Sequence, residues 1–117
     1  QVRYRVRTVV TCRVEGDASV NLSPMHALHL FRIAQEAVQN AFKHASAGRV
    51  EVVVRATGAQ VELVVHDDGR FRPAPGDAAL DGFGLPGMQR RAAEIQGTFR
   101  LETDGGTTVR VSVPLRP

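Results

Sequence analysis

The sequence is poor in the residues that cross-link a chain or stack aromatic rings. Its 117 residues include one cysteine, no tryptophan, five phenylalanines and one tyrosine. A single cysteine excludes a disulfide within the chain and leaves no cysteine spacing of the kind that holds a metal ion. Cys12 lies in a stretch of alternating apolar residues, and we expect it to be a small buried side chain.

Long apolar segments are absent as well. No run approaches the ~20 residues that a membrane-spanning helix needs. Arginines alternate with other residues at positions 3, 5 and 7, which is not the layout of a signal peptide. We therefore expect this part of the protein to be cytoplasmic, without direct contact to a membrane.

Positively charged residues outnumber negatively charged ones only slightly. Lysine and arginine number 15 against 12 aspartate and glutamate residues, which gives a net charge of +3. The arginines are scattered, aromatic residues are few, and no helix carries a basic stripe, so we expect no nucleic-acid binding. The hydrophobic fraction of 43% is typical of a soluble folded protein, and the length predicts one domain over residues 1–117.

Apolar periodicity predicts five strands and two helices. Alternation typical of half-buried strands covers residues 2–14, 49–56, 60–66, 98–103 and 107–114. Helical spacing begins at Ser23 and Pro24, continues to about Ser46, and returns over residues 85–96 before Gly97. Residues 69–84 are rich in Gly, Pro, Asp and Ala without an apolar period, so they predict a lid-like loop.

The long predicted helix has an apolar side and a polar side. With about 100° between successive residues, one stripe collects seven apolar residues, and we expect that stripe to lie on the sheet. Its members are Ala27, Phe31, Ala34, Val38, Ala41, Phe42 and Ala45. The opposite side gathers a carboxylate, an amide, an amine and an imidazole: Glu36, Asn40, Lys43 and His44.

Those four side chains have the chemistry of a metal and phosphate site. Mg²⁺ takes oxygen ligands such as an asparagine carbonyl, and a phosphate chain needs a cation such as lysine. A polar helix face is also usual for solvated surface, so the helix alone leaves both interpretations open.

Two shorter motifs follow along the chain. Asp67-Asp68-Gly69 stands where a predicted strand ends, and Gly82-Phe83-Gly84-Leu85 opens the next predicted helix. An aspartate at a strand end is most often a turn former, and glycines before a helix most often supply backbone freedom. A helix N-terminus reached through glycines can also present its N–H groups to phosphate.

Together, these features resemble the motif series of the GHKL ATPase superfamily, which includes histidine kinases, gyrase and certain chaperones. Residues 32–45 resemble the N-box of the nitrate-sensor and lipid-sensor subfamily of histidine kinases, and residues 64–69 resemble the G1 box. Residues 82–88 are similar to the G2 box, and Gly106-Thr107 matches a late glycine-threonine pair. The resemblance, to the ATP-binding (HATPase_c) catalytic domain, covers nearly the whole chain. It implies an α/β (α+β) two-layer sandwich: a mixed, mostly antiparallel sheet packed on helices, with a short ATP lid.

On the phosphate side, the resemblance implies a role for each matched residue of the N-box. Asn40 would coordinate the Mg²⁺ that bridges the phosphates. Glu36 would hold or polarise a metal-bound or nucleophilic water, which makes it the second candidate metal residue. Lys43 and His44 would approach the phosphate chain.

On the adenine side, the resemblance implies that the Asp67 carboxylate accepts a hydrogen bond from the adenine amino group. Gly69 would let the backbone pass close to the ring. The Thr107 hydroxyl would support Asp67, often through water.

At the lid, the resemblance implies that the N–H groups of Gly82 and Gly84 meet phosphates, while Leu85 packs near the nucleotide. One departure from the family pattern is visible. The G1 box usually ends in a second glycine, where this chain has Phe71. Lid geometry and turnover therefore depend on this substitution more than adenine binding does.

The resemblance implies an ATP-dependent protein histidine kinase that uses ATP and Mg²⁺. None of the described motifs places His26, His29 or His66 on an exposed dimerisation helix. We therefore expect the acceptor histidine to lie on a dimerisation domain outside this chain. That domain would make the full protein a homodimer, which could be anchored in a membrane, and a response regulator would receive the phosphate.

On this interpretation the isolated chain binds ATP without autophosphorylating. Two alternatives stay open at this point. One is a non-catalytic nucleotide-binding module with a degenerate lid, and the other is a serine kinase of the anti-sigma-factor type.

Overall fold

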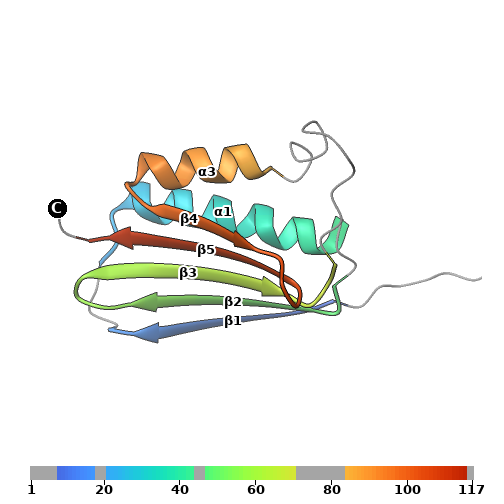
Figure 1. The fold of residues 1–117 in the computed structure, drawn as a ribbon. Coiled ribbons are helices and arrows are strands. Elements are labelled where there is room, and N and C mark those ends of the chain that lie inside the picture. Colours follow the sequence, from blue (N-terminus) through green and yellow to red (C-terminus); the bar gives the residue numbers. More distant parts are fainter. Residues whose placement is uncertain (1–7, 18–20, 44–46, 71–83, 116–117) are drawn as a thin grey trace, which may run out of the picture.

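Five strands form one sheet in the computed structural model, and two helices cover one face of that sheet (Figure 1). The structure describes residues 8–17, 21–43, 47–70 and 84–115. The helices are α1 (Pro24–Lys43) and α3 (Leu85–Glu94). The strands are β1 (Val9–Gly16), β2 (Arg49–Ala56), β3 (Gln60–Asp67), β4 (Thr98–Glu102) and β5 (Thr107–Pro114).

The sheet is mixed and mostly antiparallel, which confirms the predicted fold class. Its strand order is β1-β2-β3-β5-β4. Strands β1 and β2 run parallel, and the other three neighbouring pairs are antiparallel. A parallel pair needs a crossover connection, and α1 supplies it between β1 and β2. The two predicted hairpins, β2–β3 and β4–β5, are both present.

The helix boundaries follow from local chemistry. Ser23 caps α1, because its hydroxyl oxygen accepts a hydrogen bond from the His26 backbone N–H at 3.1 Å. At the end of α3, Gly97 donates to the Ala92 carbonyl at 2.8 Å, while Gln96 takes a positive φ of 54°. The predicted continuation of α1 to Ser46 falls on residues 44–46, which lie outside the described residues.

The core lies between the helices and the strands. Leu30, Ile33, Ala37 and Ala41 of α1 are buried together with Met88 and Ala92 of α3. On the sheet side, alternate residues of β3 and β5 complete the core: Val61, Leu63, Val65, Val109, Val111 and Val113. Removing these side chains from water is the main stabilising term for a domain of this size.

The predicted stripe on α1 was wrong for several of its members. Ala41 is buried, but Phe31 and Phe42 are 60% and 49% exposed, and Ala27 is exposed as well. Ala45 lies outside the described residues. The cause is that the apolar arc of α1 is wider than the part that contacts this chain's own sheet. Cys12 of β1, which we expected to be buried, is likewise exposed.

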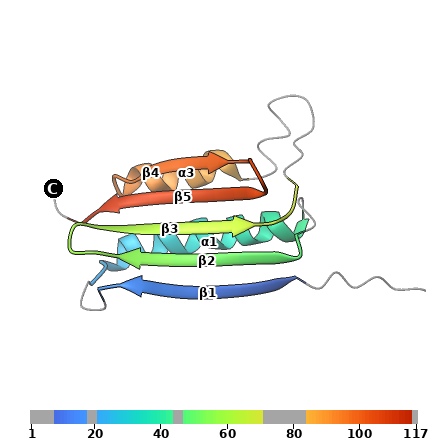
Figure 2. The same ribbon diagram turned by 60° about the horizontal axis from the view of Figure 1, so that its bottom comes forward.

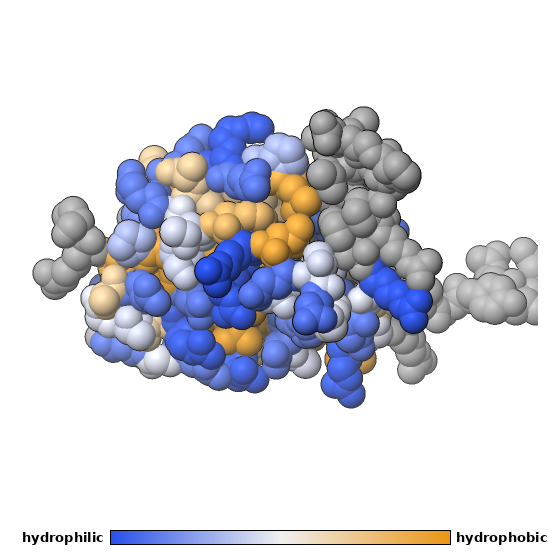
Figure 3. All heavy atoms as spheres, viewed as in Figure 1, coloured by the Kyte–Doolittle hydropathy of each residue, from blue (hydrophilic) through white to orange (hydrophobic). Residues whose placement is uncertain are grey.

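The other face of the sheet is covered by charged side chains. Arg13 pairs with Glu51, and Arg55 pairs with Glu62, each at 3.1 Å. Exposed pairs of this kind contribute only ~0–1 kcal/mol each. The side of the molecule drawn in Figure 3 is accordingly mostly hydrophilic, with smaller apolar patches between the polar side chains. In the part of the chain that the structure describes, no helix has the length and apolarity needed to cross a membrane.

Candidate functional site

One end of the sandwich collects the predicted motifs. The C-terminal ends of α1 and β3 lie at the same end of the molecule as the beginnings of α3 and β5 (Figures 1 and 2). The sequence positions of Asn40, Asp67, Gly84 and Thr107 therefore come together although 67 residues separate the first from the last. The strand and helix directions produce this clustering.

Asp67 and Thr107 face each other across neighbouring strands. They are partners in the β3–β5 register, and they are only 4% and 8% exposed. Asp67 accepts a hydrogen bond at Oδ1 from the Gly69 backbone N–H at 2.9 Å. Burial raises the pKa of the Asp67 carboxyl, and the Gly69 hydrogen bond partly offsets that increase. A buried carboxylate is therefore held at the end of β3.

The Thr107 hydroxyl is buried and has no hydrogen-bond partner among the described residues. An unsatisfied buried polar group costs ~1–3 kcal/mol, so a hydroxyl in this position is expected to meet a water or a ligand. Two features of this hydroxyl, its burial and its place opposite Asp67, fit a polar ring edge or a bridging water.

Gly106 makes the close approach of β5 to β3 possible. A Cβ atom at this position would lie 2.2 Å from the Asp67 backbone oxygen, and the residue has a φ of 112°. Only glycine can take this backbone conformation without a clash. The glycine-threonine pair therefore places Thr107 beside Asp67.

Asp68 has a different role from its neighbour. Its Oδ1 atom accepts hydrogen bonds from the Gly48 and Arg49 backbone N–H groups at 2.8 and 3.0 Å. These two bonds lower the pKa of the Asp68 carboxyl and tie the end of β3 to the start of β2. The resemblance to the G1 box singled out Asp67, and the strand register agrees, because it pairs Asp67 with the buried Thr107.

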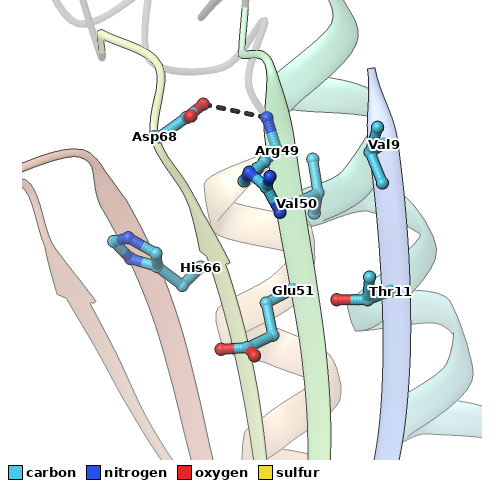
Figure 4. A pocket seen from close by; sticks show the side chains of 7 residues that line it. All are labelled: Val9, Thr11, Arg49, Val50, Glu51, His66 and Asp68. Atoms are coloured by element: carbon cyan, nitrogen blue, oxygen red, sulfur yellow. Dashed lines mark hydrogen bonds between the residues drawn. The ribbon is translucent and has the colours of Figure 1, made fainter.

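A shallow cavity of about 260 Å³ lies on the outer face of the sheet and includes Asp68 (Figure 4). Thr11, Glu51 and His66 line it from three neighbouring strands. His66 Nδ1 lies 2.8 Å from the Thr108 hydroxyl. Because Asp67 faces the helix layer and Asp68 faces away from it, this cavity is not part of the site around Asp67.

Glu36, Asn40 and Lys43 follow one another along one side of α1, as their spacing predicts. Glu36 and Asn40 are half-buried, and Lys43 is exposed in the last turn. His44, the fourth member of the predicted group, lies outside the described residues. So does Gly82 of the predicted lid motif.

Glu36 packs directly against Gly84. A Cβ atom at Gly84 would lie 2.7 Å from Cγ and Cδ of Glu36 and 2.8 Å from its Oε1 atom. Gly84 has a φ of 70° and caps α3, so the Glu36 carboxylate lies beside the N-terminus of that helix. Free N–H groups and the helix dipole favour negative charge at this position. Leu85, the first residue of α3, packs against the core.

A cleft of about 250 Å³ continues from this contact between α1 and α3. Besides Glu36 and Gly84 it is lined by two cations, Arg32 and Arg91. Neither arginine is among the residues predicted for the site. The sequence could have indicated Arg32, because it stands one turn before Glu36 on the polar side of the same helix.

Within the described residues, no group of three or more His, Cys, Asp or Glu side chains could hold a metal ion. Asn40 and Glu36, one helical turn apart at the same end of the molecule, are the predicted metal residues that the structure describes. A hard cation at this position would need further oxygen ligands from a bound molecule or from water.

Comparison with known proteins agrees with this geometry. The family described as histidine kinase-, DNA gyrase B-, and HSP90-like ATPase (HATPase_c) matches residues 25–117. The chain belongs to this family. The match covers both described helices, apart from the first residue of α1, and every described strand except β1, so it includes each described element that contributes to the candidate site.

Curated relatives of this HATPase_c chain are histidine kinases. The chain is 39% identical over 95 residues to the signal transduction histidine-protein kinase/phosphatase UhpB of Salmonella typhimurium, a match covering 81% of this chain and 19% of UhpB. It is also 39% identical over 92 residues to the sensor histidine kinase LiaS of Bacillus subtilis, which covers 76% of this chain and 25% of LiaS. The chain thus spans a fifth to a quarter of the length of these relatives.

Solved structures share the fold. The ATP-binding domain of PrrB from Mycobacterium tuberculosis has a TM-score of 0.65 at 23% identity, covering 97% of this chain and 84% of that structure. The blue-light-activated histidine kinase EL346 of Erythrobacter litoralis has a TM-score of 0.64 at 24% identity, covering 93% of this chain and 36% of that chain. These two likenesses support the sandwich architecture.

Proposed function

We propose that this chain is the ATP-binding catalytic domain of a longer sensor histidine kinase. In the proposed reaction it binds Mg-ATP and directs the γ-phosphate to a histidine of a dimerisation domain, from which the phosphate passes to a response regulator. Residues 1–117 would form one domain on the cytoplasmic side. The observation that carries the proposal is the buried Asp67 carboxylate facing the Thr107 hydroxyl, which has no hydrogen-bond partner within the described part of the chain.

The pair on β3 and β5 supports adenine recognition. A buried acceptor discriminates well, because a ring that presents no donor to it leaves the carboxylate unpaired. Adenine carries an amino group that can donate to Asp67, whereas guanine carries a carbonyl oxygen at the same ring position. Thr107 would complete the contact directly or through a water, and Gly69 would leave room for the ring.

The helix side supports phosphate binding. Bound Mg-ATP would supply a reactive phosphoryl group whose charge is partly offset by the metal ion. Asn40 would hold the metal through its carbonyl oxygen, with Glu36 binding the metal directly or through a water. Lys43, with His44 next to it, would offset the remaining charge, and the N-terminus of α3 at Gly84 would accept the phosphates.

For nucleotide binding, the sharpest test is a calorimetric titration of the 117-residue chain. Mg-ATP, Mg-GTP and metal-free ATP would be compared on the wild type and on Asn40→Ala and Asp67→Asn. We expect Mg-ATP to bind, Mg-GTP to bind at least tenfold more weakly, and Asn40→Ala to remove the difference between Mg-ATP and metal-free ATP. A wild-type domain that ignores Mg-ATP at millimolar concentration would overturn the proposal.

Phosphoryl transfer is tested separately in the full-length kinase. A single turnover with γ-labelled ATP should label a histidine outside residues 1–117, and the 117-residue chain alone should remain unlabelled. Glu51→Gln is a suitable control, because this carboxylate lies on the opposite face of the sheet. Nucleotide binding without any labelling of the full-length protein would leave a non-catalytic nucleotide module as the function.

A further inference from the structure

An apolar groove of about 550 Å³ runs between β1 and α1. We call it the β1–α1 groove and define it by Val10, Cys12 and Val14 of β1 and Phe31 and Val38 of α1. Its lining includes neither Asp67 nor Thr107, whereas Gln35 and Gln39 line both this groove and the cleft between α1 and α3. Nothing in the part of the chain that the structure describes fills it.

The side chains of the groove have the pattern of a buried surface but are exposed. Val10, Val14 and Phe31 are 40%, 79% and 60% exposed. Full burial of a side chain of this kind is worth ~1.5–3 kcal/mol, so an uncovered row of them is unfavourable in water. Two residues of this groove, Phe31 and Cys12, were predicted to be buried and are exposed instead. Both are explained if the surface is covered in the complete protein.

Among the described residues, neither helix has its main contacts with β1. Strands in a sheet lie ~4.8 Å apart and packed helices ~8–10 Å apart, so one helix covers about two strands. Helix α1 contacts β2 and β3, and α3 contacts β4, whereas the main contacts of β1 are with β2. The uncovered strip is therefore about one strand wide, and a helix placed over it would pack against both β1 and the exposed side of α1.

We propose that the β1–α1 groove is the docking site for one amphipathic helix, supplied by the part of the full-length kinase that lies outside this chain. This rests on the proposed function, because it takes the chain to be part of a longer protein. The chain covers only 19% and 25% of the length of UhpB and LiaS. Most of a protein of that length lies outside this chain, and this groove is an apolar surface among the described residues on which part of it could pack.

The dimensions of the groove define its occupant. From Ala27 to Val38 its α1 wall has 12 residues, and the 11 rises of ~1.5 Å between them give about 16 Å, or three helical turns. The occupant would present apolar residues at spacings of three and four over that length. A helix held there would lie alongside α1, which also carries Glu36 and Asn40. Docking would thereby fix the orientation of the nucleotide site relative to the rest of the kinase.

Cys12 is a built-in reporter for this proposal, because it is the only cysteine of the chain and it lines the groove. The rate of its alkylation by N-ethylmaleimide would be followed by mass spectrometry of the Cys12 peptide, in the 117-residue chain and in the full-length kinase. We expect alkylation to be about tenfold or more slower in the full-length kinase, because the thiol reacts only when the helix leaves. Phe31→Ser in the full-length kinase should restore the fast rate.

Met25→Ser is the matched control. Met25 lies on the same helix and has the same 60% exposure as Phe31, but it does not line the groove. This variant should keep the slow rate of the full-length kinase. If Phe31→Ser unfolds the protein, Val14→Ser on the opposite wall is the second variant, since Val14 is 79% exposed and contributes little to the folded chain.

Three outcomes would overturn the proposal. Equal alkylation rates in the two proteins would mean that the groove stays open. Slow alkylation of the 117-residue chain as a monomer would mean that its own residues fill the groove, and slow alkylation as a dimer would make a second copy the occupant. Titration of the same samples with Mg-ATP tests the proposed function independently, so failure of one proposal is distinguishable from failure of the other.

Discussion

Replacing Asp67 by asparagine should abolish adenine recognition while leaving the fold intact. The asparagine side chain has nearly the same shape, and its carbonyl oxygen can still accept the Gly69 N–H bond that Asp67 Oδ1 accepts at 2.9 Å. Its amide nitrogen, however, would present a donor where the carboxylate presents an acceptor. The adenine amino group is also a donor, so the two groups would repel each other.

The expected loss of affinity follows from the strength of a charged hydrogen bond. Such a bond contributes ~1.5–3 kcal/mol, and every ~1.4 kcal/mol is a factor of ten, so Mg-ATP should bind Asp67→Asn about 10-fold to 150-fold more weakly. Stability should move the other way. Burial raises the pKa of Asp67, which means that the folded state disfavours its charge. The neutral variant should therefore be as stable as the wild type at pH 7, or more stable.

Asp68→Asn is the matched control, one residue along the chain and on the other face of the sheet. An asparagine oxygen can still accept the two backbone N–H bonds that Asp68 Oδ1 accepts, but without the charge that strengthens them, so this variant should lose stability in urea denaturation and keep the wild-type affinity for Mg-ATP. Calorimetry and denaturation on both variants give a two-by-two comparison. If Asp67→Asn binds Mg-ATP within about twofold of the wild type, a difference under ~0.5 kcal/mol, the carboxylate does not read adenine.

Three further predictions concern the same end of the molecule. Thr107→Val removes the buried hydroxyl without a change of shape, so it should weaken Mg-ATP binding several-fold in calorimetry. The urea concentration at the midpoint of unfolding should stay the same or rise. A lower midpoint would show that the hydroxyl has a partner within the protein. Gly106→Ala should destabilise the chain by roughly 2–4 kcal/mol in urea unfolding, because a Cβ would lie 2.2 Å from the Asp67 backbone oxygen. Gly105→Ala is the control, because a Cβ there would meet open space. An equal loss of stability in the two variants would contradict this prediction. Between its folded and unfolded pKa values, a carboxyl holds more protons in the state with the higher pKa. The pKa of Asp67 is raised above 3.8 in the folded state, so its contribution to the free energy of unfolding should fall as pH rises above 3.8. The pKa of Asp68 is lowered below 3.8, so its stabilising contribution should be lost as pH falls below 3.8. The difference in free energy of unfolding between the wild type and each Asn variant, measured from pH 3 to pH 6, should show these opposite slopes, and parallel differences would refute the assignment.

The order and type of the elements could be predicted from the sequence because their patterns are local. Alternation over residues 49–56, 60–66 and 107–114 predicts three strands, and the structure places strands there. Ser23 and Pro24 predict the beginning of α1, and Gly97 predicts the end of α3. Each of these signals depends on the backbone chemistry of a few neighbouring residues.

The orientation of α1 could not be predicted in the same way. Its apolar arc is broad enough to allow more than one rotation over the sheet, and the larger aromatic side chains favoured the wrong one. Ile33 and Ala37 pack on the sheet, whereas Phe31 faces the open groove. The choice depends on the side chains of β2 and β3 that face α1, which are distant in the sequence. The contact of Glu36 with Gly84 was out of reach for the same reason, since it depends on how α1 and α3 pack together.

The choice of Asp67 rather than Asp68 as the proposed adenine acceptor agrees with the strand register. Two adjacent aspartates end β3, and successive side chains of a strand point to opposite faces of the sheet. The pairing of Asp67 with Thr107 places the first of them toward the helices. A slip of one residue would turn Thr107 outward and pair Asp67 with a different residue. Gly106 opposes such a slip, because any residue with a Cβ atom in its place would collide with the Asp67 carbonyl. The late glycine therefore helps to select which carboxylate faces the helix layer, and in the proposed function nucleotide specificity would depend on a residue that carries no side chain.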